Sequence, residues 1–332
     1  MSAVISQAIP TNIITGFLGT GKTTAIVQLL KSKPANERWA ILVNEFGEIG
    51  VDGSLFSGKH SEESGVFIRE VPGGCMCCSA ALPMQIALNQ LLSKAKPDRL
   101  IIEPTGLGHP VEVLEVLKSE HYQNILDIQK IVTLVDARKV SDQRYTSHEI
   151  FNQQLSIADV IIANKQDLYA PDDKDQLEAY IASLSCPAKA IFYTEQGQIG
   201  TDLLEGETAA VGKKQQHHHH TEERMLASEQ DLPESGFLQA VNQGEGFNSI
   251  GWRFSPDKVF NRGALLGFFA CLRVERLKAV FITEAGIFSY NQTLDGLTEQ
   301  ELDECFESRI EIIADQIDSQ WQATLLDCQE LA

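Results

Sequence analysis

The chain has 332 residues, of which 43% are hydrophobic and 22% charged, which is typical of a globular protein and enough for one α/β domain with a smaller companion. Its formal net charge of −19 disfavours nucleic acids and anionic membrane surfaces as partners. No apolar run reaches the roughly 18 residues that a membrane span needs, and residues 1–10 lack a signal-peptide pattern. We therefore expect a cytoplasmic protein that binds neither nucleic acid nor membrane.

The first part of the chain alternates short apolar runs with segments of helical period. The apolar runs predict strands at residues 13–15, 40–43, 100–102, 131–135, 160–162 and 190–192. A further run at 66–71 either joins the same sheet or forms a short ribbon. Helices are predicted at 23–31, 80–94, 111–117, 149–155 and 174–184. Since near-continuous apolar strands are buried on both faces, we predict a three-layer α/β domain with a mostly parallel sheet over residues 1–205.

The composition turns polar over residues 206–235, which we interpret as a linker. This stretch contains four consecutive histidines, His217 to His220, which are either a metal-collecting tract or part of a plain polar linker. Residues 236–332 then predict a smaller α+β domain. Its predicted strands are 247–254, 277–283, 286–290 and 310–313, and its predicted helices are 258–271 and a last helix that reaches residue 331.

The segment Gly16–Thr23 fits the pattern G-x-x-x-x-G-K-[ST] and lies between a predicted strand and a predicted helix. In such a loop the backbone N–H groups converge on phosphate oxygens, Lys22 neutralises the β- and γ-phosphates, and the Thr23 hydroxyl binds Mg²⁺. The candidate nucleotide-binding residues are Gly16, Gly19, Thr20, Gly21, Lys22, Thr23 and Thr24. The alternative, a glycine turn beside a helix, is disfavoured by this context.

The tetrapeptide Asn164–Asp167, N-K-Q-D, directly follows the predicted strand at 160–162. The Asp167 carboxylate can accept both the ring N–H and the exocyclic amine of guanine, and the Lys165 stem can lie along the base. Adenine would leave that carboxylate unpaired. We therefore predict GTP as the nucleotide, with Asn164, Lys165 and Asp167 at the base, and note that a capping Asn beside surface charges gives the same tetrapeptide.

Two further segments with a carboxylate and a glycine follow predicted strands, and the one at residues 44–52 is dense in both. Glu103 and Gly106 follow one strand, where Glu103 is a candidate for the Mg²⁺ shell or for positioning water, and Gly106 for sensing the γ-phosphate. With Lys22 they form the predicted catalytic set; alternatively, Glu103 caps the next helix. The loop after the strand at 40–43 carries Glu48 and Asp52, which we predict to order around Mg²⁺ and the terminal phosphate.

Three thiols, Cys75, Cys77 and Cys78, crowd together where a predicted helix begins. A helix N-terminus lowers the pKa of thiols, and three thiolates can converge on one soft cation. Zinc is the preferred cation, with cobalt as the alternative, and three sulfurs leave a fourth position open for another ligand. Packed free thiols or a redox pair are the competing interpretations.

Taken together, these motifs resemble the CobW-type GTPases, a family of zinc-regulated metal chaperones and metalloprotein activators. The resemblance covers roughly residues 10–200, and the G-G-C-x-C-C element is its most specific part. It implies GTP hydrolysis coupled to the binding of a divalent metal by the cysteines and its delivery to a client metalloprotein. Val43 stands where some relatives have a carboxylate, so no metal site using that carboxylate is expected.

The leading hypothesis is thus a GTP-hydrolysing metallochaperone for zinc. A second is a GTP-binding zinc or cobalt sensor or buffer with little turnover. A third, a small-molecule kinase, gives no reason for the guanine tetrapeptide or the cysteines. The sequence names neither the client nor the oligomeric state.

Overall fold

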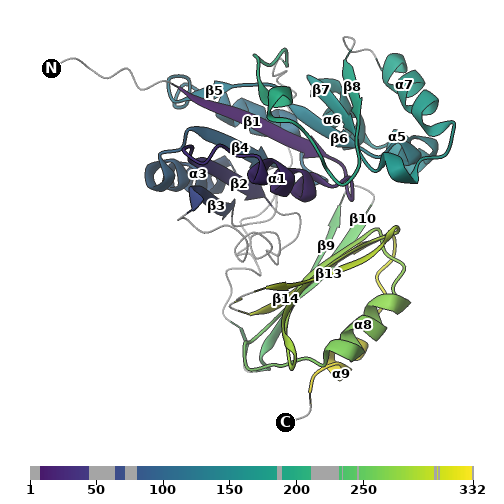
Figure 1. The fold of residues 1–332 in the computed structure, drawn as a ribbon. Coiled ribbons are helices and arrows are strands. Elements are labelled where there is room, and N and C mark those ends of the chain that lie inside the picture. Colours follow the sequence, from purple (N-terminus) through teal and green to yellow (C-terminus); the bar gives the residue numbers. More distant parts are fainter. Residues whose placement is uncertain are drawn as a thin grey trace. The chain divides into compact units, whose positions relative to one another are not determined.

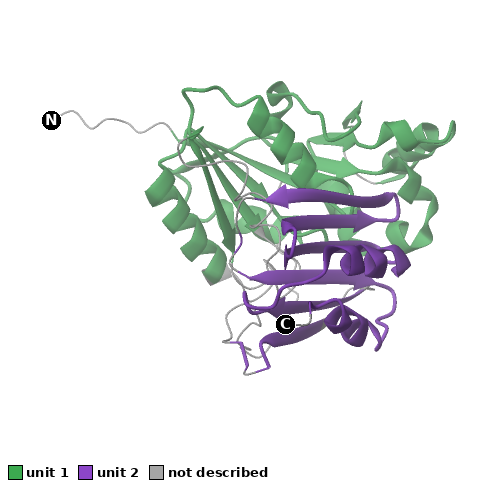
Figure 2. Ribbon diagram, turned by 60° about the horizontal axis from the view of Figure 1, so that its bottom comes forward, with its two compact units in different colours: residues 1–44, 62–71, 75–221 green, residues 45–61, 72–74, 222–332 purple. Residues whose placement is uncertain are grey.

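The computed structural model describes residues 8–44, 64–71, 81–184, 189–210, 232–233, 235–244, 247–302, 305 and 307–330. The chain divides into two compact units, coloured green and purple in Figure 2. Described residues up to 210 belong to unit 1, and those from 232 onward belong to unit 2. Within the described ranges, no helix has the length and apolarity that crossing a membrane requires.

Unit 1 is built on a sheet in which every described strand pairing is parallel. The strand order is β3-β2-β4-β1-β6-β7-β8, with β5 pairing β1 (Figure 1). The predicted run at 66–71 therefore joins this sheet. The strands are β1 Ile9–Gly16, β2 Trp39–Asn44, β3 Val66–Val71, β4 Arg99–Glu103, β5 Leu126–Ile128, β6 Val132–Val135, β7 Val160–Ala163 and β8 Ala190–Tyr193.

Helices connect these strands and cover the sheet, which confirms the predicted α/β class. In β4, Leu100 and Ile102 join the apolar cluster formed with α3 and α4, and Ile101, which points to the other face, is equally buried. Both faces of the sheet are therefore covered. The helices are α1 Lys22–Lys31, α3 Ala81–Ala95, α4 Pro110–Leu117, α5 Gln143–Thr146, α6 Glu149–Ile157 and α7 Asp173–Ser183, with short 3-10 turns η2 Ala137–Ser141, η3 Gln166–Leu168 and η4 Thr201–Leu204.

The segment after η4 remains hydrogen-bonded to unit 1. Asn12 Nδ2 donates to the Leu204 carbonyl at 2.7 Å, Gln129 Oε1 accepts from Gly206 N at 2.8 Å, and Asp159 Oδ1 accepts from Ala209 N at 2.8 Å. The first residues of the predicted linker thus pack on the edge of the sheet where its strands begin. The histidines at 217–220 lie outside the described residues.

Unit 2 is an antiparallel sheet with two helices, as the predicted α+β class requires. Its strand order is β13-β12-β11-β14-β10-β9, and α8 and α9 lie on one side of the sheet (Figure 1). The elements are β9 Phe237–Gly244, β10 Phe247–Phe254, β11 Arg276–Thr283, β12 Gly286–Thr293, β13 Gly296–Leu302, β14 Ser308–Ala314, α8 Arg262–Cys271 and α9 Trp321–Asp327.

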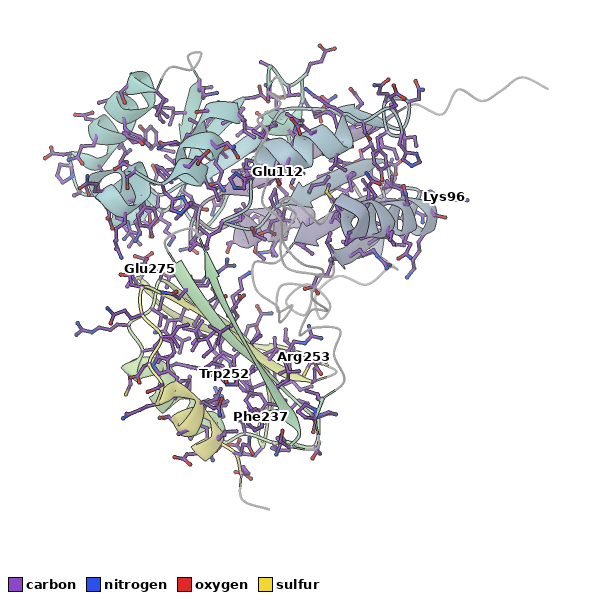
Figure 3. All side chains as sticks on the ribbon, turned by 180° about the vertical axis from the view of Figure 1, so that it is seen from behind. Lys96, Glu112, Phe237, Trp252, Arg253 and Glu275 are labelled. Carbon is purple, nitrogen blue, oxygen red and sulfur yellow. The ribbon has the colours of Figure 1, made fainter. Side chains whose placement is uncertain are left out.

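Successive side chains of β10 in unit 2 point alternately to an apolar face and to a polar face of the sheet. Trp252 on β10 is fully buried in the apolar cluster and donates its indole N–H to Gln322 Oε1 at 3.3 Å. The next residue in the strand, Arg253, points to the other face (Figure 3). Its guanidinium forms a double hydrogen bond with Glu307 at 2.7 and 3.0 Å. The pKa of the Glu307 carboxyl is lowered because the attraction of Arg253 and Arg309 outweighs the effect of burial.

Four features of unit 2 differ from the sequence-based expectation. The last helix, predicted to reach residue 331, ends at Asp327. The edge strands β9 and β13 were not predicted, because polar side chains interrupt their apolar alternation and edge strands bury little. The helix predicted from residue 258 begins only at Arg262. Its cap is Asn261, whose Oδ1 accepts from Ala264 N at 2.9 Å, and the preceding Phe260 forms bridges to Thr283 and Gln329.

Candidate functional site

The loop between β1 and α1, residues 16–21, is called the glycine loop below. Its three glycines have positive φ angles of 145°, 70° and 96° at Gly16, Gly19 and Gly21. A Cβ at Gly16 would lie 2.4 Å from the Leu134 carbonyl oxygen, and one at Gly21 would lie 2.6 Å from Asn164 Nδ2. Larger residues are therefore excluded by both conformation and space, and the loop exposes only backbone before a helix N-terminus.

Lys22 begins α1 and folds its side chain back over the glycine loop. Its Nζ donates to the carbonyls of Gly16 at 2.8 Å and Phe17 at 3.2 Å, and the residue is only 5% exposed. The hydroxyl of Thr20 closes the same turn by donating to the Phe17 carbonyl at 3.0 Å. The Lys22 ammonium therefore lies inside the turn that the glycine loop makes.

Thr23 and Glu103 meet at the edge of the sheet where parallel strands end. Glu103 is the last residue of β4, which pairs with β1, and it is 2% exposed. The Thr23 hydroxyl donates to Glu103 Oε1 at 2.8 Å. A hydroxyl beside a carboxylate is an all-oxygen donor pair that suits Mg²⁺. The next helix, α4, has His109 at its N-cap position, so Glu103 is not its capping residue.

Gly106 lies in the segment 104–109 that follows β4, called the Gly106 loop below. A Cβ on Gly106 would lie 2.8 Å from Leu18 Cδ2 and 3.1 Å from the Leu18 backbone nitrogen. The Gly106 loop therefore packs directly against the glycine loop, and glycine permits this close approach. Lys22, Thr23, Glu103 and Gly106, the residues predicted to act on phosphates, are brought to one edge of the sheet.

Asn164, the first residue of the N-K-Q-D segment, is 2% exposed and bridges two loops. Its Nδ2 donates to the Thr20 carbonyl at 2.9 Å, and its Oδ1 accepts from Gly197 N at 3.0 Å. Lys165 has a positive φ of 64°, and its Nζ lies 4.0 Å from Asp136 Oδ2. Asp167 is exposed on η3. The side chain of Asn164 is therefore hydrogen-bonded to the protein's own backbone, whereas Asp167 is exposed to solvent.

The loop after β8 is a part of the site that the sequence reasoning missed. Gly197 has a φ of 67°, and a Cβ there would lie 2.7 Å from Ala25 N in the first turn of α1. Thr194 is fixed by a hydrogen bond from its N–H to the Ala163 carbonyl at 3.0 Å, and its carbonyl accepts from Gln166 N at 3.0 Å. The signal available in the sequence was a glycine soon after the predicted strand at 190–192.

The aromatic support of the glycine loop was also missed. Phe17 is 1% exposed, and its ring packs edge-on against Tyr145, His148 and Phe151, with centroid distances of 5.2, 4.8 and 5.8 Å. These rings come from α5, α6 and the turn between them. In the sequence, aromatic residues on a helix indicate a core position but do not identify the loop that they contact.

Tyr169 is a third residue that sequence reasoning did not single out. Its hydroxyl donates to the Asn164 carbonyl and accepts from Ala137 N at 3.1 Å, which links the ends of β7 and β6. Burial is the main reason that the pKa of this phenol lies well above its ordinary value. The hydroxyl therefore stays protonated and able to donate at any ordinary pH.

The predicted metal ligands Cys75, Cys77, Cys78, Glu48 and Asp52 lie outside the described residues. Within the part of the chain that is described, no group of three or more His, Cys, Asp and Glu side chains is arranged to hold a metal ion. Cys271, Cys305 and Cys328, which are described, are free thiols.

Comparison with known proteins gives relatives that match between about half and nearly all of the chain. The zinc chaperone YeiR of Escherichia coli is 39% identical over 318 residues, which cover 94% of this chain and 95% of that protein. The zinc chaperone CobW of Sinorhizobium sp is 29% identical over 221 residues, 60% of this chain and 62% of CobW. The zinc-regulated GTPase metalloprotein activator 1 of Schizosaccharomyces pombe is 30% identical over 186 residues, 55% of this chain and 45% of that protein.

Residues 10–192 match the family described as CobW/HypB/UreG, nucleotide-binding domain. This range contains the glycine loop, Glu103, the Gly106 loop and the N-K-Q-D segment. The chain therefore belongs to the CobW/HypB/UreG nucleotide-binding family.

Proposed function

We propose that this protein is a GTP-hydrolysing metallochaperone that binds zinc through Cys75, Cys77 and Cys78 and delivers it to a client metalloprotein. The observation that carries the proposal is the convergence of Lys22, Thr23 and Glu103 at one edge of the sheet, beside a glycine loop tied to Asn164. The names of the relatives, zinc chaperones and a zinc-regulated GTPase metalloprotein activator, support the metal-related part.

The phosphates would bind in the curve of the glycine loop. Its backbone N–H groups and the N-terminus of α1 favour negative charge, and the Lys22 ammonium would exchange two loop carbonyls for phosphate oxygens. Thr23 and Glu103 would hold Mg²⁺, which would neutralise charge on the phosphates when bound. We assign Lys22, Glu103 and Gly106 to catalysis because they would adjoin the terminal phosphate of a nucleotide bound in the glycine loop.

The base would lie against the N-K-Q-D segment. Both polar groups of the Asn164 side-chain amide are hydrogen-bonded, one to the glycine loop and the other to Gly197. These bonds fix the N-K-Q-D segment relative to the proposed phosphate site. Asp167 is exposed and so keeps its carboxylate oxygens for a ligand. A carboxylate that accepts two donors favours guanine over adenine.

Zinc is the cargo in this proposal, and cobalt is the alternative because thiolates accept both metals. Glu48 and Asp52, in the segment that follows β2 in sequence, would respond to Mg²⁺ and the γ-phosphate and so couple the nucleotide to the metal. We place the protein in the cytoplasm, where thiols are kept reduced and able to bind metal.

The test is a comparison of nucleotide turnover and metal content. The purified protein should hydrolyse GTP but not ATP in the presence of Mg²⁺, and should bind zinc with a stoichiometry that falls when all three cysteines are replaced by serine. Equal turnover of GTP and ATP would contradict the base assignment. Binding of GTP and zinc without turnover, even with a client present, would favour the sensor or buffer.

A further inference from the structure

The buried glutamine Gln154 on α6 reaches out of its helix to the Gly106 loop. Its Nε2 donates to the Gly106 carbonyl at 3.1 Å, and the residue is 1% exposed. The helix is fixed at the same position, because the Gln154 backbone carbonyl accepts from the Thr133 hydroxyl of β6 at 2.8 Å. The donor amide therefore has little freedom to move relative to the sheet.

The hydrogen bonds around Gly106 orient the peptide groups on both of its sides. The carbonyl of Thr105 accepts from Gly108 N at 3.2 Å, and the carbonyl of Gly106 accepts from Gln154. In a trans peptide the N–H points opposite to the C=O of the same group. Holding the Thr105 carbonyl therefore sets the direction of the Gly106 N–H, and holding the Gly106 carbonyl keeps the residue from turning about its own φ and ψ.

The position of Gly106 makes this orientation relevant to a nucleotide. Its backbone lies against the backbone of Leu18 in the glycine loop, as the 3.1 Å approach of a Cβ to Leu18 N indicates. Glu103, which bonds Thr23, precedes it by one short turn of the same segment. A donor at Gly106 thus lies beside the end of the phosphate site that the last phosphate would occupy.

The chemistry of Gln154 indicates that the donor has a purpose beyond filling space. Its Oε1 is buried and has no hydrogen-bond partner among the described residues. A buried amide with only one of its two polar groups hydrogen-bonded stabilises the folded protein less than an apolar side chain of the same size. Its presence is therefore explained best if the hydrogen bond that it makes serves function. Only the NH₂ end can serve a carbonyl, so the orientation of the amide is set by Gly106.

We propose that Gln154 is a positioning residue that fixes the Gly106 N–H to donate to the γ-phosphate of GTP, and so contributes to the distinction between GTP and GDP. This inference rests on the proposed function. GDP has no γ-phosphate, so loss of the positioning affects the binding of GTP and leaves that of GDP unchanged. A purely structural glutamine would affect both nucleotides alike.

The test measures dissociation constants for GDP and for a non-hydrolysable GTP analogue, in wild type and in Gln154→Met, which keeps the length of the side chain and removes the donor. We expect the analogue to bind about tenfold more weakly and GDP to change less than about twofold, since one buried hydrogen bond is at stake. In steady state, kcat for GTP should fall by a similar factor.

The matched control is Gln153→Met, the same change at the preceding residue. Gln153 Oε1 is paired with His109 Nδ1 at 3.2 Å, at the far end of the Gly106 loop, so its loss should leave the ratio of GTP to GDP affinity unchanged. Thermal unfolding reports whether each variant is folded. If Gln154→Met is unfolded, Gln154→Asn, whose side chain is one methylene shorter, takes its place. We expect the same decrease in the ratio of GTP-analogue affinity to GDP affinity.

The outcomes separate this inference from the proposed function. A wild-type protein that binds no guanine nucleotide overturns the proposed function and the inference with it. A wild type that binds both nucleotides, together with a folded Gln154 variant whose affinity ratio is unchanged, overturns only the inference. An equal loss for GDP and the analogue assigns Gln154 to packing and also overturns it.

Discussion

The side chain of Asn164 donates to the backbone carbonyl of Thr20 at 2.9 Å, which ties the end of β7 directly to the glycine loop. The same side chain accepts from Gly197 N at 3.0 Å, so three loops from distant parts of the chain meet at one buried amide. In unit 1 this bond connects the segment proposed to read the base with the loop proposed to hold the phosphates.

We expect Asn164→Ala to weaken GTP and GDP equally, by at least about tenfold, because both nucleotides need the two loops in register. The change leaves the Thr20 carbonyl and the Gly197 N–H unpaired in a buried place, and should lower the free energy of unfolding by about 2–4 kcal/mol. Denaturant unfolding and nucleotide titration measure the two effects. A variant with wild-type stability and affinity would show that the bridge is dispensable.

Asp167→Asn should change the choice of base without changing stability. Asp167 is exposed, so the free energy of unfolding should stay within about 0.5 kcal/mol of wild type. GTP binding should weaken by about 2–4 kcal/mol, and xanthosine triphosphate, which presents an acceptor where guanine has an amine, should gain affinity. Titration with both nucleotides tests this, and unchanged GTP affinity in the variant would remove Asp167 from the base site.

Lys22→Ala should abolish the main positive charge of the glycine loop. We expect GTP turnover to fall at least ~10²-fold, because the transferring phosphate loses the cation that neutralises it. Lys31→Ala, an exposed lysine in the last turn of the same helix, is the control and should retain turnover. Circular dichroism checks the fold, and turnover that survives in a folded Lys22 variant would locate the reaction elsewhere.

The sequence predicted the parts of the site whose chemistry depends on residue type at fixed spacing. Lys22, Thr23 and Glu103 come from motifs that follow strands, and parallel strands bring their carboxyl ends to one edge of a sheet. Gln154 could not be found in this way, and the position of Gly197 after a predicted strand did not by itself show what this glycine contacts. A polar residue within an amphipathic helix and a glycine in a loop acquire their roles from the segments that folding places beside them, 48 residues away in sequence for Gln154 and Gly106.

The elements of the fold that could be predicted are those whose burial determines the residue types in the sequence. Buried parallel strands such as β4 read as continuous apolar runs, whereas the edge strand β13 reads as polar because most of its residues are exposed or half-exposed. The start of α8 depended on a tertiary contact, the bridges of Phe260, which overrode the helical pattern of the residues before Arg262.

Tyr169→Phe should loosen the base segment without touching the phosphates. It removes the hydroxyl that links the Asn164 carbonyl and Ala137 N. Discrimination between GTP and inosine triphosphate, which lacks the exocyclic amine, should decrease by about tenfold, because both hydrogen bonds of the Tyr169 hydroxyl are lost. Tyr193→Phe, whose hydroxyl bonds Glu178 at 2.8 Å on the surface, is the control. An unchanged discrimination would limit Tyr169 to stability.

The same variant should alter the dependence of stability on alkaline pH. The pKa of Tyr169 is raised in the folded state from an ordinary value of 10.0, chiefly by burial. The unfolded chain therefore loses this proton first, so the contribution to stability is complete below about pH 10 and falls as the pH rises further. Tyr169→Phe should show a shallower loss of stability above pH 10, and an identical slope would contradict the assignment.

Replacing Cys75, Cys77 and Cys78 together by serine tests the proposed coupling between metal and nucleotide. If the segment with Glu48 and Asp52 and the Gly106 loop both respond to the γ-phosphate, zinc affinity in wild type should differ between the GDP and GTP-analogue states by about 1–3 kcal/mol. Zinc should then shift nucleotide affinity by the same factor.

The triple variant should lose high-affinity zinc and the coupling, because serine hydroxyls stay protonated and bind soft cations poorly, while GTP binding at Lys22 and Asp167 persists. Calorimetric titration of zinc in each nucleotide state gives both quantities. Zinc affinity that survives the triple change would assign the metal to other ligands, such as the histidines at 217–220. Zinc binding that is lost in the variant but insensitive to nucleotide in wild type would make the cysteines a static site, because delivery of the metal requires that hydrolysis change its affinity.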